Sequence, residues 1–119
     1  MSYRILVTGS RQWKDGWLVE DALLAAVDSA PDDEIVVVHG AAKGFDTIAD
    51  EVARDFGLRV EAHRAQDHPD PLARNQHMVD LGADICLAFA LDWASGTGHC
   101  ARRARQAGIP TIDYGVNTE

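Results

Sequence analysis

Hydrophobic positions follow two alternating patterns along the chain, and together they predict five strands separated by four helices. Short apolar runs rich in Val and Ile favour strands at residues 4–8, 34–39, 58–63, 84–89 and 110–113. Between these runs, apolar residues recur at spacings of three and four, which is the period of a helix with one buried face. The helical patterns cover about residues 19–27, 45–56, 72–81 and 97–107, and Gly57, Gly82 and Gly108 follow three of them as stop signals.

This alternation predicts an α/β fold built on a parallel sheet. Consecutive parallel strands need crossover connections, and right-handed crossovers place helices on both faces of the sheet. The runs "IVVV" (35–38) and "ICLAFA" (85–90) are apolar at every position, as expected of central strands buried on both faces. We therefore expect a doubly wound, five-stranded parallel sheet in a three-layer α/β/α sandwich, with residues 1–115 as one domain and 116–119 as a flexible tail.

Most of the residues with distinctive chemistry follow the predicted strands. The four segments are "TGSRQWKD", "HGAAKGFD", "RAQDHPDPLARN" and "ALDWASGTGH". Ligands of open α/β sheets bind beyond the carboxyl ends of the strands, and glycine-rich helix starts there offer free backbone N–H groups to anions. We predict one ligand pocket, formed by Gly9, Ser10, Arg11, Gly40, Lys43, Gly44, Asp46, Arg74, Asn75, Gly96, Thr97 and Gly98.

Several of these residues also have ordinary structural interpretations. Arg11 offers a planar donor fork to phosphate or carboxylate, but it also fits a plain turn, where Ser10 can cap the next segment. Asp46 can accept hydrogen bonds from ribose hydroxyls, or it can simply stabilise the start of its helix. Arg74 is expected at the rim of the pocket, either as the partner of an anion or in a surface pair with Asp67 or Asp70.

Composition narrows the functional classes. The net charge is -8, and an acidic surface repels phosphate backbones, so nucleic-acid binding is disfavoured. No apolar run approaches the roughly 20 residues that a membrane span needs, and no signal peptide is visible. The cysteines Cys86 and Cys100 are far apart in the sequence and are expected to pack in the core, which fits a reducing, cytoplasmic setting.

Metal and cofactor motifs are not recognisable in the sequence. The five histidines do not follow the ligand spacings of common metal sites, so we expect no metal and no cofactor. The "HGAAKG" segment lacks the Gly-Lys-Ser/Thr of a P-loop, which argues against ATP or GTP hydrolysis. The "GTGHCA" segment formally matches a dinucleotide fingerprint, but it follows the fourth predicted strand instead of the first.

Taken together, the loop segments resemble a known family. The segments "RILVTGSRQW", "VVHGAAKGFDTIADEVA", "RNQHMVDLGADICLAF" and "SGTGHCARRARQAGIPTID" are similar to the YspA/YpsA-related branch of the SLOG superfamily over most of the chain. This resemblance implies a Rossmann-like sheet, a SLOG-type nucleotide-binding domain, and small stand-alone relatives in phages and bacteria. It also implies that "GAAKG" has little side chain because a sugar or phosphate lies against its backbone.

The same superfamily includes the Lonely Guy phosphoribohydrolases, which cleave the N-glycosidic bond of nucleoside monophosphates. Arg74 falls on the arginine of their third-helix motif, but Cys100 falls on the position of their glutamate. A thiol cannot replace a carboxylate that stabilises an oxocarbenium-like transition state. The resemblance therefore implies the phosphate-binding part of that site without its full catalytic machinery.

We expect the chain to bind a nucleotide-derived small molecule, either ADP-ribose-like or a nucleoside phosphate, as a sensor or sequestering module. One alternative is a hydrolase acting on an N-glycosidic or phosphoester bond, with Arg74, Asp46 and Asp92 as candidate catalytic residues. A second alternative is a DNA-processing accessory protein, because DNA-uptake proteins share the superfamily. The resemblance and the apolar helix faces also predict a homodimer joined through the third and fourth helices.

Overall fold

The computed structural model describes residues 2–31 and 34–115, so the predicted tail at 116–119 lies outside the described residues. The strands are β1 (Ser2–Gly9), β2 (Glu34–His39), β3 (Arg59–Ala62), β4 (Ile85–Ala90) and β5 (Thr111–Gly115). The helices are α1 (Gly16–Ser29), α2 (Phe45–Asp55), α3 (Pro71–Asp80) and α4 (Gly96–Gln106). Every predicted strand and helix is present, with ends that differ by a few residues from the sequence pattern.

The five strands form one parallel sheet in the order β3-β2-β1-β4-β5. The chain first winds outward from β1 to β3, then crosses back to place β4 on the other side of β1. This reversal creates a topological switch point between β1 and β4, where doubly wound folds hold their ligands. Strands β2 and β4 each have a neighbour on both sides, which explains why their sequences are apolar at nearly every position.

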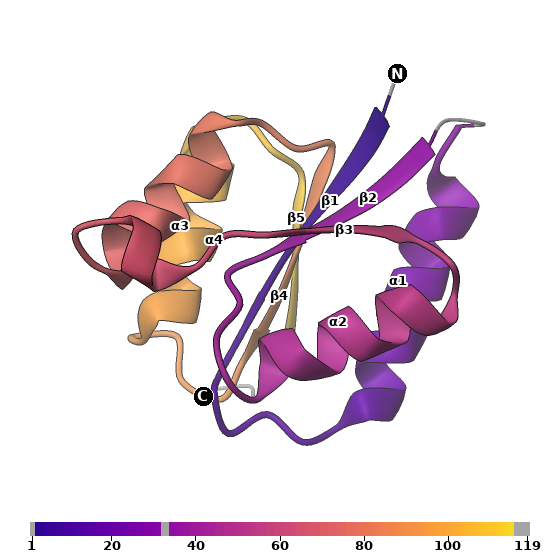
Figure 1. Ribbon diagram of the computed structural model, residues 1–119, viewed down its shortest axis with the longest axis horizontal. Helices are drawn as coiled ribbons and strands as arrows, with labels where there is room; N and C mark the ends of the chain where they lie inside the picture. The colour runs from indigo at the N-terminus through magenta and orange to yellow at the C-terminus, as the bar shows by residue number, and fades with distance from the viewer. Residues whose placement is uncertain (1, 32–33, 116–119) are drawn as a thin grey trace.

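Helices cover both faces of the sheet, as Figure 1 shows: α1 and α2 lie on one side, and α3 and α4 lie on the other. The first pair packs on a core that includes Leu23, Phe45 and Phe89. The second pair packs on a separate core around Leu6, Met78 and Cys100. The predicted Rossmann-like, three-layer α/β/α architecture is confirmed.

The connection from β3 to α3 contains an element that the periodicity did not predict. A single 3₁₀ turn, η1 (Ala65–Asp67), follows β3, and Arg64 and Asp67 at its ends are paired by side-chain hydrogen bonds of 3.2 Å. A turn of this length carries no helical repeat in its sequence, so hydrophobic spacing cannot reveal it. Neither of the surface pairs considered for Arg74 forms, because Asp67 pairs with Arg64 and Asp70 caps α3.

None of the helices in the described ranges is both long enough and apolar enough to cross a membrane.

Candidate functional site

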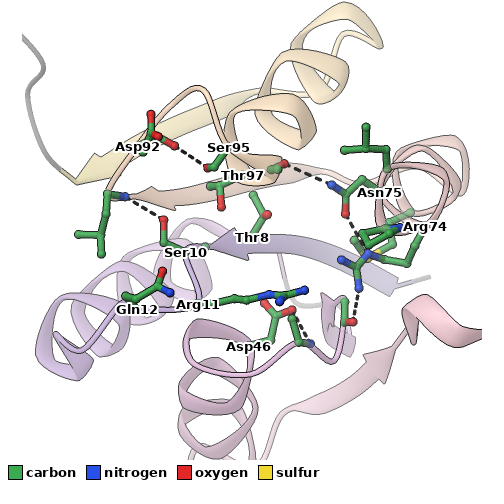
Figure 2. Close-up of a pocket in the computed structure, with 18 residues that line it drawn as sticks. Thr8, Ser10, Arg11, Gln12, Asp46, Arg74, Asn75, Asp92, Ser95 and Thr97 are labelled. Carbon is green, nitrogen blue, oxygen red and sulfur yellow. Dashed lines mark hydrogen bonds between the residues drawn. The ribbon is translucent and has the colours of Figure 1, made fainter.

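A pocket of about 530 Å³ opens at the carboxyl edge of the sheet, across the switch point between β1 and β4. Its wall comes from the loop after β1, the loop after β2, the first turns of α3, and the segment between β4 and α4 (Figure 2). These are the four segments that the sequence singled out. The lining residues are Thr8, Gly9, Ser10, Arg11, Gln12, Gly40, Ala42, Asp46, Pro71, Leu72, Arg74, Asn75, Met78, Leu91, Asp92, Ser95, Gly96 and Thr97.

Most of the predicted ligand-binding residues line this pocket. The structure brings together Gly9, Ser10, Arg11, Gly40, Asp46, Arg74, Asn75, Gly96 and Thr97, together with the catalytic candidate Asp92. Three predicted residues, Lys43, Gly44 and Gly98, are not part of its wall. Lys43 is exposed and is not among the residues that line the pocket.

Arg74 is a buried residue, which corrects the expectation that it sits at the rim. Only 8% of its surface is exposed. Its Nη1 donates to the carbonyl oxygen of Gly40 and, at 3.4 Å, to that of His63, while Nε donates to Oδ1 of Asn75 at 2.9 Å. The helix α3 thereby holds the loop after β2 and the end of β3 in place, as Figure 2 shows for the first of these contacts.

Asn75 extends this network to the opposite wall of the pocket. Its Nδ2 donates to the carbonyl oxygen of Gly96 at 3.2 Å, where α4 begins. Arg74 and Asn75 therefore link the loop after β2, α3 and the start of α4 through side chains that are both buried. Because these hydrogen bonds join buried side chains to the backbone of two other segments, they hold the three segments relative to each other before any ligand arrives.

The bare "GAAKG" loop is explained by contacts within the protein. A Cβ at Gly40 would lie 2.6 Å from Cζ of Arg74, and a Cβ at Gly44 would overlap the carbonyl group of Arg11. Gly44 also has a φ of 77°, a left-handed conformation that favours glycine. The protein's own groups therefore explain why these two positions are glycines, and the expectation that a ligand lies against this loop stays a prediction, because Gly40 also lines the pocket.

Two other predicted site glycines have a similar explanation. A Cβ at Gly9 would collide with the ring of Phe45, and one at Gly98 would collide with the carbonyl group of Trp93. At Gly96, in contrast, the nearest atom is Nδ2 of Asn75 at 4.0 Å. Among the five predicted site glycines, Gly96 therefore has the most space around its Cα, and it lines the pocket.

Ser10 does not cap the helix that follows it. Its Oγ accepts a hydrogen bond from the backbone N–H of Leu91 at 2.9 Å and so ties the loop after β1 to the loop after β4. The cap of α1 is instead Asp15, whose Oδ1 accepts from the N–H of Leu18. Ser10 therefore holds the switch point together, with its side chain at the pocket edge (Figure 2).

The four helix starts differ in their side-chain caps. The starts of α1 and α3 are capped by the carboxylates of Asp15 and Asp70. The N-cap residues of α2 and α4, Gly44 and Ser95, make no side-chain hydrogen bond to their helices. The first-turn N–H groups of α4 therefore lack a side-chain acceptor at a site where the helix dipole favours a negative charge.

Asp46 is a buried carboxyl group at the pocket, with 6% of its surface exposed. Its Oδ2 accepts a hydrogen bond from the N–H of Ala42 at 3.0 Å, which shapes the loop after β2. Burial raises the pKa of Asp46 above its ordinary value, although that hydrogen bond and the nearby His39 and Arg74 act in the opposite direction. A carboxyl group in this setting retains its proton at a higher pH than an exposed one.

His39 fixes the other side of the same loop. Its Nδ1 accepts from the N–H of Ala41 at 2.9 Å, so Nε2 carries the proton and donates to Oδ2 of Asp50 at 2.7 Å. Both ring nitrogens are thus engaged, and the contact at Nδ1 supports the left-handed conformation of Ala41, with φ at 55°. His39 is consequently a structural residue of the loop in this arrangement, and it does not line the main pocket.

Cys100 lies in the core instead of the pocket. It is fully buried, and burial raises the pKa of its thiol to about 11. A neutral, inaccessible thiol cannot supply the negative charge that a glutamate would provide at this position. The predicted packing role of Cys86 and Cys100 is confirmed, since both are buried free cysteines.

The sequence analysis missed several lining residues that complete the pocket. Leu72, Met78 and Leu91 contribute apolar surface, while Thr8 and Gln12 contribute polar groups. Thr8 and Gln12 flank the "GSR" motif, so their place next to predicted site residues could have identified them as pocket residues. Leu72 and Met78 follow the helical period of α3 and resemble ordinary packing residues, so only the fold assigns them to the pocket.

Comparison with known proteins agrees with this architecture. The family model described as the YspA, cpYpsA-related SLOG family matches residues 3–68. The Gene 61 protein of Mycobacterium phage D29 is 46% identical over 121 residues, covering 94% of this chain and 96% of the phage protein. No solved structure matches the chain. The matched region contains β1 to β3 and the first two loops of the pocket, and the chain belongs to the YspA, cpYpsA-related SLOG family.

Proposed function

We propose that the domain over residues 1–115 binds a nucleotide-derived small molecule at the carboxyl edge of its sheet, as a sensor or sequestering module. The observation that carries this proposal is that the guanidinium of Arg74 and the uncapped start of α4 belong to the wall of one pocket. A guanidinium and free helical N–H groups are complementary to a phosphate group. SLOG family membership is compatible with a ligand of this class.

Two arginines offer positive charge to an anion in the pocket, although Asp46 and Asp92 also line it and the protein as a whole is acidic. The net charge of -8 repels anions at long range, but solvent screens that repulsion beyond about 8–10 Å at physiological salt. Arg11 and Arg74 both line the pocket, and Figure 2 shows the exposed side chain of Arg11 extending along it toward Asp46. The buried Arg74 supplies a fixed charge, and Arg11 supplies a mobile one.

The remaining lining groups suit the other parts of a nucleotide. Carboxylate oxygens of Asp46 and Asp92 accept hydrogen bonds, as ribose hydroxyl groups require. Leu72, Met78 and Leu91 provide apolar surface of the kind that covers a base. A pocket of about 530 Å³ lies within the usual range for small-molecule sites.

Binding without turnover is the favoured function because the glycosidase carboxylate is replaced by the buried Cys100. A specific observation nevertheless supports a second function. Asp46 is buried, borders the pocket and has a raised pKa, which are properties of a general acid. The second candidate is therefore hydrolysis of an N-glycosidic or phosphoester bond, with Asp46 donating the proton.

The first experiment is a thermal-shift screen of nucleoside phosphates and ADP-ribose, followed by calorimetric titration of each compound that raises the melting temperature. We expect Arg11→Ala to weaken binding about 10-fold, since a hydrogen bond to a charged group contributes about 1.5 kcal/mol or more. Arg59→Ala is the matched control, because Arg59 is exposed and pairs with Glu34 at the opposite end of the sheet. Equal affinity in Arg11→Ala and Arg59→Ala would contradict the proposed site.

The second experiment separates binding from hydrolysis. Each bound nucleotide is incubated with the protein, and released base, sugar or phosphate is measured by chromatography. A pure binding module gives no product. Product formation that is lost in Asp46→Asn, while the affinity for the nucleotide remains, would establish the hydrolase alternative and exclude the sensor function.

A further inference from the structure

Three histidines that are separate in sequence come together, one of them on α3. His63 follows β3, His68 follows η1, and His77 belongs to the second turn of α3. One ring nitrogen from each residue lies within 4.8 Å of the other two. The ring centroids of His63 and His77 are 5.3 Å apart, and those of His68 and His77 are 4.8 Å apart.

We propose that His63, His68 and His77 form a binding site for Zn²⁺. Imidazole nitrogens lie about 2.0–2.1 Å from zinc, so two of them in a tetrahedral site are about 3.4 Å apart, with ring centroids about 5 Å apart. The observed centroid distances already match this value. All three residues are partly exposed, so small rotations of their side chains can close the remaining gap between the nitrogens.

A carboxylate behind the cluster orients one of the proposed ligands. Nε2 of His63 lies 2.8 Å from Oε2 of Glu61. Arg4 donates to both oxygens of Glu61, at 3.2 and 2.7 Å, which holds this group as a carboxylate and therefore as an acceptor. Nε2 of His63 must then carry the proton, and the lone pair of Nδ1 is left for a metal ion.

This arrangement is the carboxylate–histidine–metal pattern in which an outer carboxylate sets the tautomer and increases the basicity of a metal-binding imidazole. Imidazole ligands suit Zn²⁺ and related transition metals, whereas Mg²⁺ and Ca²⁺ prefer oxygen ligands. Three protein ligands leave a fourth tetrahedral position that a water molecule can occupy. The structure therefore assigns an open, three-histidine site.

The proposed metal would fasten three consecutive segments of the chain. It would join the end of β3, the residue after η1 and the body of α3, where the connection otherwise relies on exposed contacts such as the Arg64–Asp67 pair. The backbone carbonyl of His63 also accepts from Nη1 of Arg74. Metal binding would thus stabilise the wall that positions Arg74, although the cluster itself does not line the pocket.

The test is calorimetric titration of the full chain with ZnCl₂ at pH 7.5, after treatment with a chelator and its removal. We expect one Zn²⁺ per chain for the wild type. His68→Asn and His77→Asn should each lose this binding, and Glu61→Gln should weaken it about 10- to 100-fold by removing the outer carboxylate. His99→Asn is the control, since it removes a partly exposed histidine on α4, outside the cluster.

Two further measurements distinguish a variant that cannot bind Zn²⁺ from a variant that is not folded. Circular dichroism melts in the presence of EDTA should give similar midpoints for the wild type and His68→Asn, while added Zn²⁺ should raise only the midpoint of the wild type. Co²⁺ should produce the visible absorption of a tetrahedral site in the wild type. Binding that is unchanged in His68→Asn and His77→Asn, or equally lost in His99→Asn, or undetectable in the wild type, would overturn the proposal.

Discussion

The carbonyl oxygen of Gly40 accepts a hydrogen bond from Nη1 of Arg74, and the guanidinium lies so close to Gly40 that no side chain fits there. Gly40 follows the last residue of β2, and Arg74 opens the second turn of α3. The two residues therefore depend on each other: the glycine leaves room for the charge, and the charge satisfies the glycine's carbonyl group. This contact therefore helps to fix the position of the Arg74 guanidinium in the pocket wall.

We predict that Gly40→Ala destabilises the protein by about 1–3 kcal/mol, as overpacking of a filled site does. The added methyl group would displace Arg74 and break the contact with the carbonyl oxygen of residue 40. Chemical denaturation measures the change in the free energy of unfolding. Gly16→Ala is the matched control, because its Cβ would make only an ordinary contact of 3.7 Å with Ile48. Equal stability of the two variants would contradict this explanation of the loop.

Arg74→Ala should also be destabilising, because the residue is buried and its partners would be left unsatisfied. The loss of hydrogen bonds to a charged group predicts a decrease of about 1.5–3 kcal/mol in the free energy of unfolding. Arg59→Ala, which removes an exposed guanidinium, should change it by less than about 0.5 kcal/mol. Urea unfolding curves that coincide for Arg74→Ala and the wild type would show that the Arg74 side chain does not contribute to the stability of the fold.

Two aspartates of α2 should contribute to the pH dependence of stability with opposite signs. Burial raises the pKa of Asp46, so its contribution falls as the pH rises above about 4. The hydrogen bond from Arg54 lowers the pKa of Asp50, so its contribution is present above about 4 and is lost as the pH falls below this value.

At pH 7, Asp46→Asn should therefore increase the free energy of unfolding, since asparagine can still accept from Ala42 without being charged. Asp50→Asn should decrease it, because the ionic contact with Arg54 is lost. Both differences from the wild type should shrink toward pH 3. The measurement is a series of unfolding curves between pH 3 and 7, and changes of the same sign in both variants would refute the assignment.

The thiols of Cys86 and Cys100 should resist modification in the folded protein. Both are fully buried, and burial raises the pKa of each, so the reactive thiolate is scarce at neutral pH. Ellman's reagent at pH 8 should react slowly with the native chain and rapidly with both thiols in guanidinium chloride. Fast reaction of one thiol under native conditions would mean that its surroundings open without global unfolding.

A homodimer joined through α3 and α4 remains a prediction. On α3, Leu72 and the cap residue Leu81 are each 48% exposed, which leaves apolar surface for a second copy. Light scattering should give twice the chain mass for the wild type and the monomer mass for Leu81→Asp. Leu24→Asp, on the exposed face of α1, is the control. A wild-type monomer at high micromolar concentration would exclude the dimer.

The sequence determined the architecture because each strand and helix carries its own hydrophobic period. The apolar runs of β2 and β4 indicated burial on both faces, and the three-and-four spacing of Val19, Ala22 and Leu23 indicated the buried face of α1. Each of these patterns lies within one short segment, so it can be recognised without knowledge of the rest of the fold. Because parallel strands end at the same edge of a sheet, the predicted topology then sufficed to bring the four loops together.

Only the tertiary structure decided what individual site residues do. Gly40, Gly44 and Gly98 are glycines because Arg74, the Arg11 backbone and the Trp93 carbonyl occupy their surroundings, and these are contacts between segments that no local pattern records. The same reason hid the cluster of His63, His68 and His77, whose spacing in the chain matches no ligand motif. Burial of Arg74 likewise depends on groups contributed by β2 and α4, so its position at the helix start could not distinguish a rim residue from a framework residue.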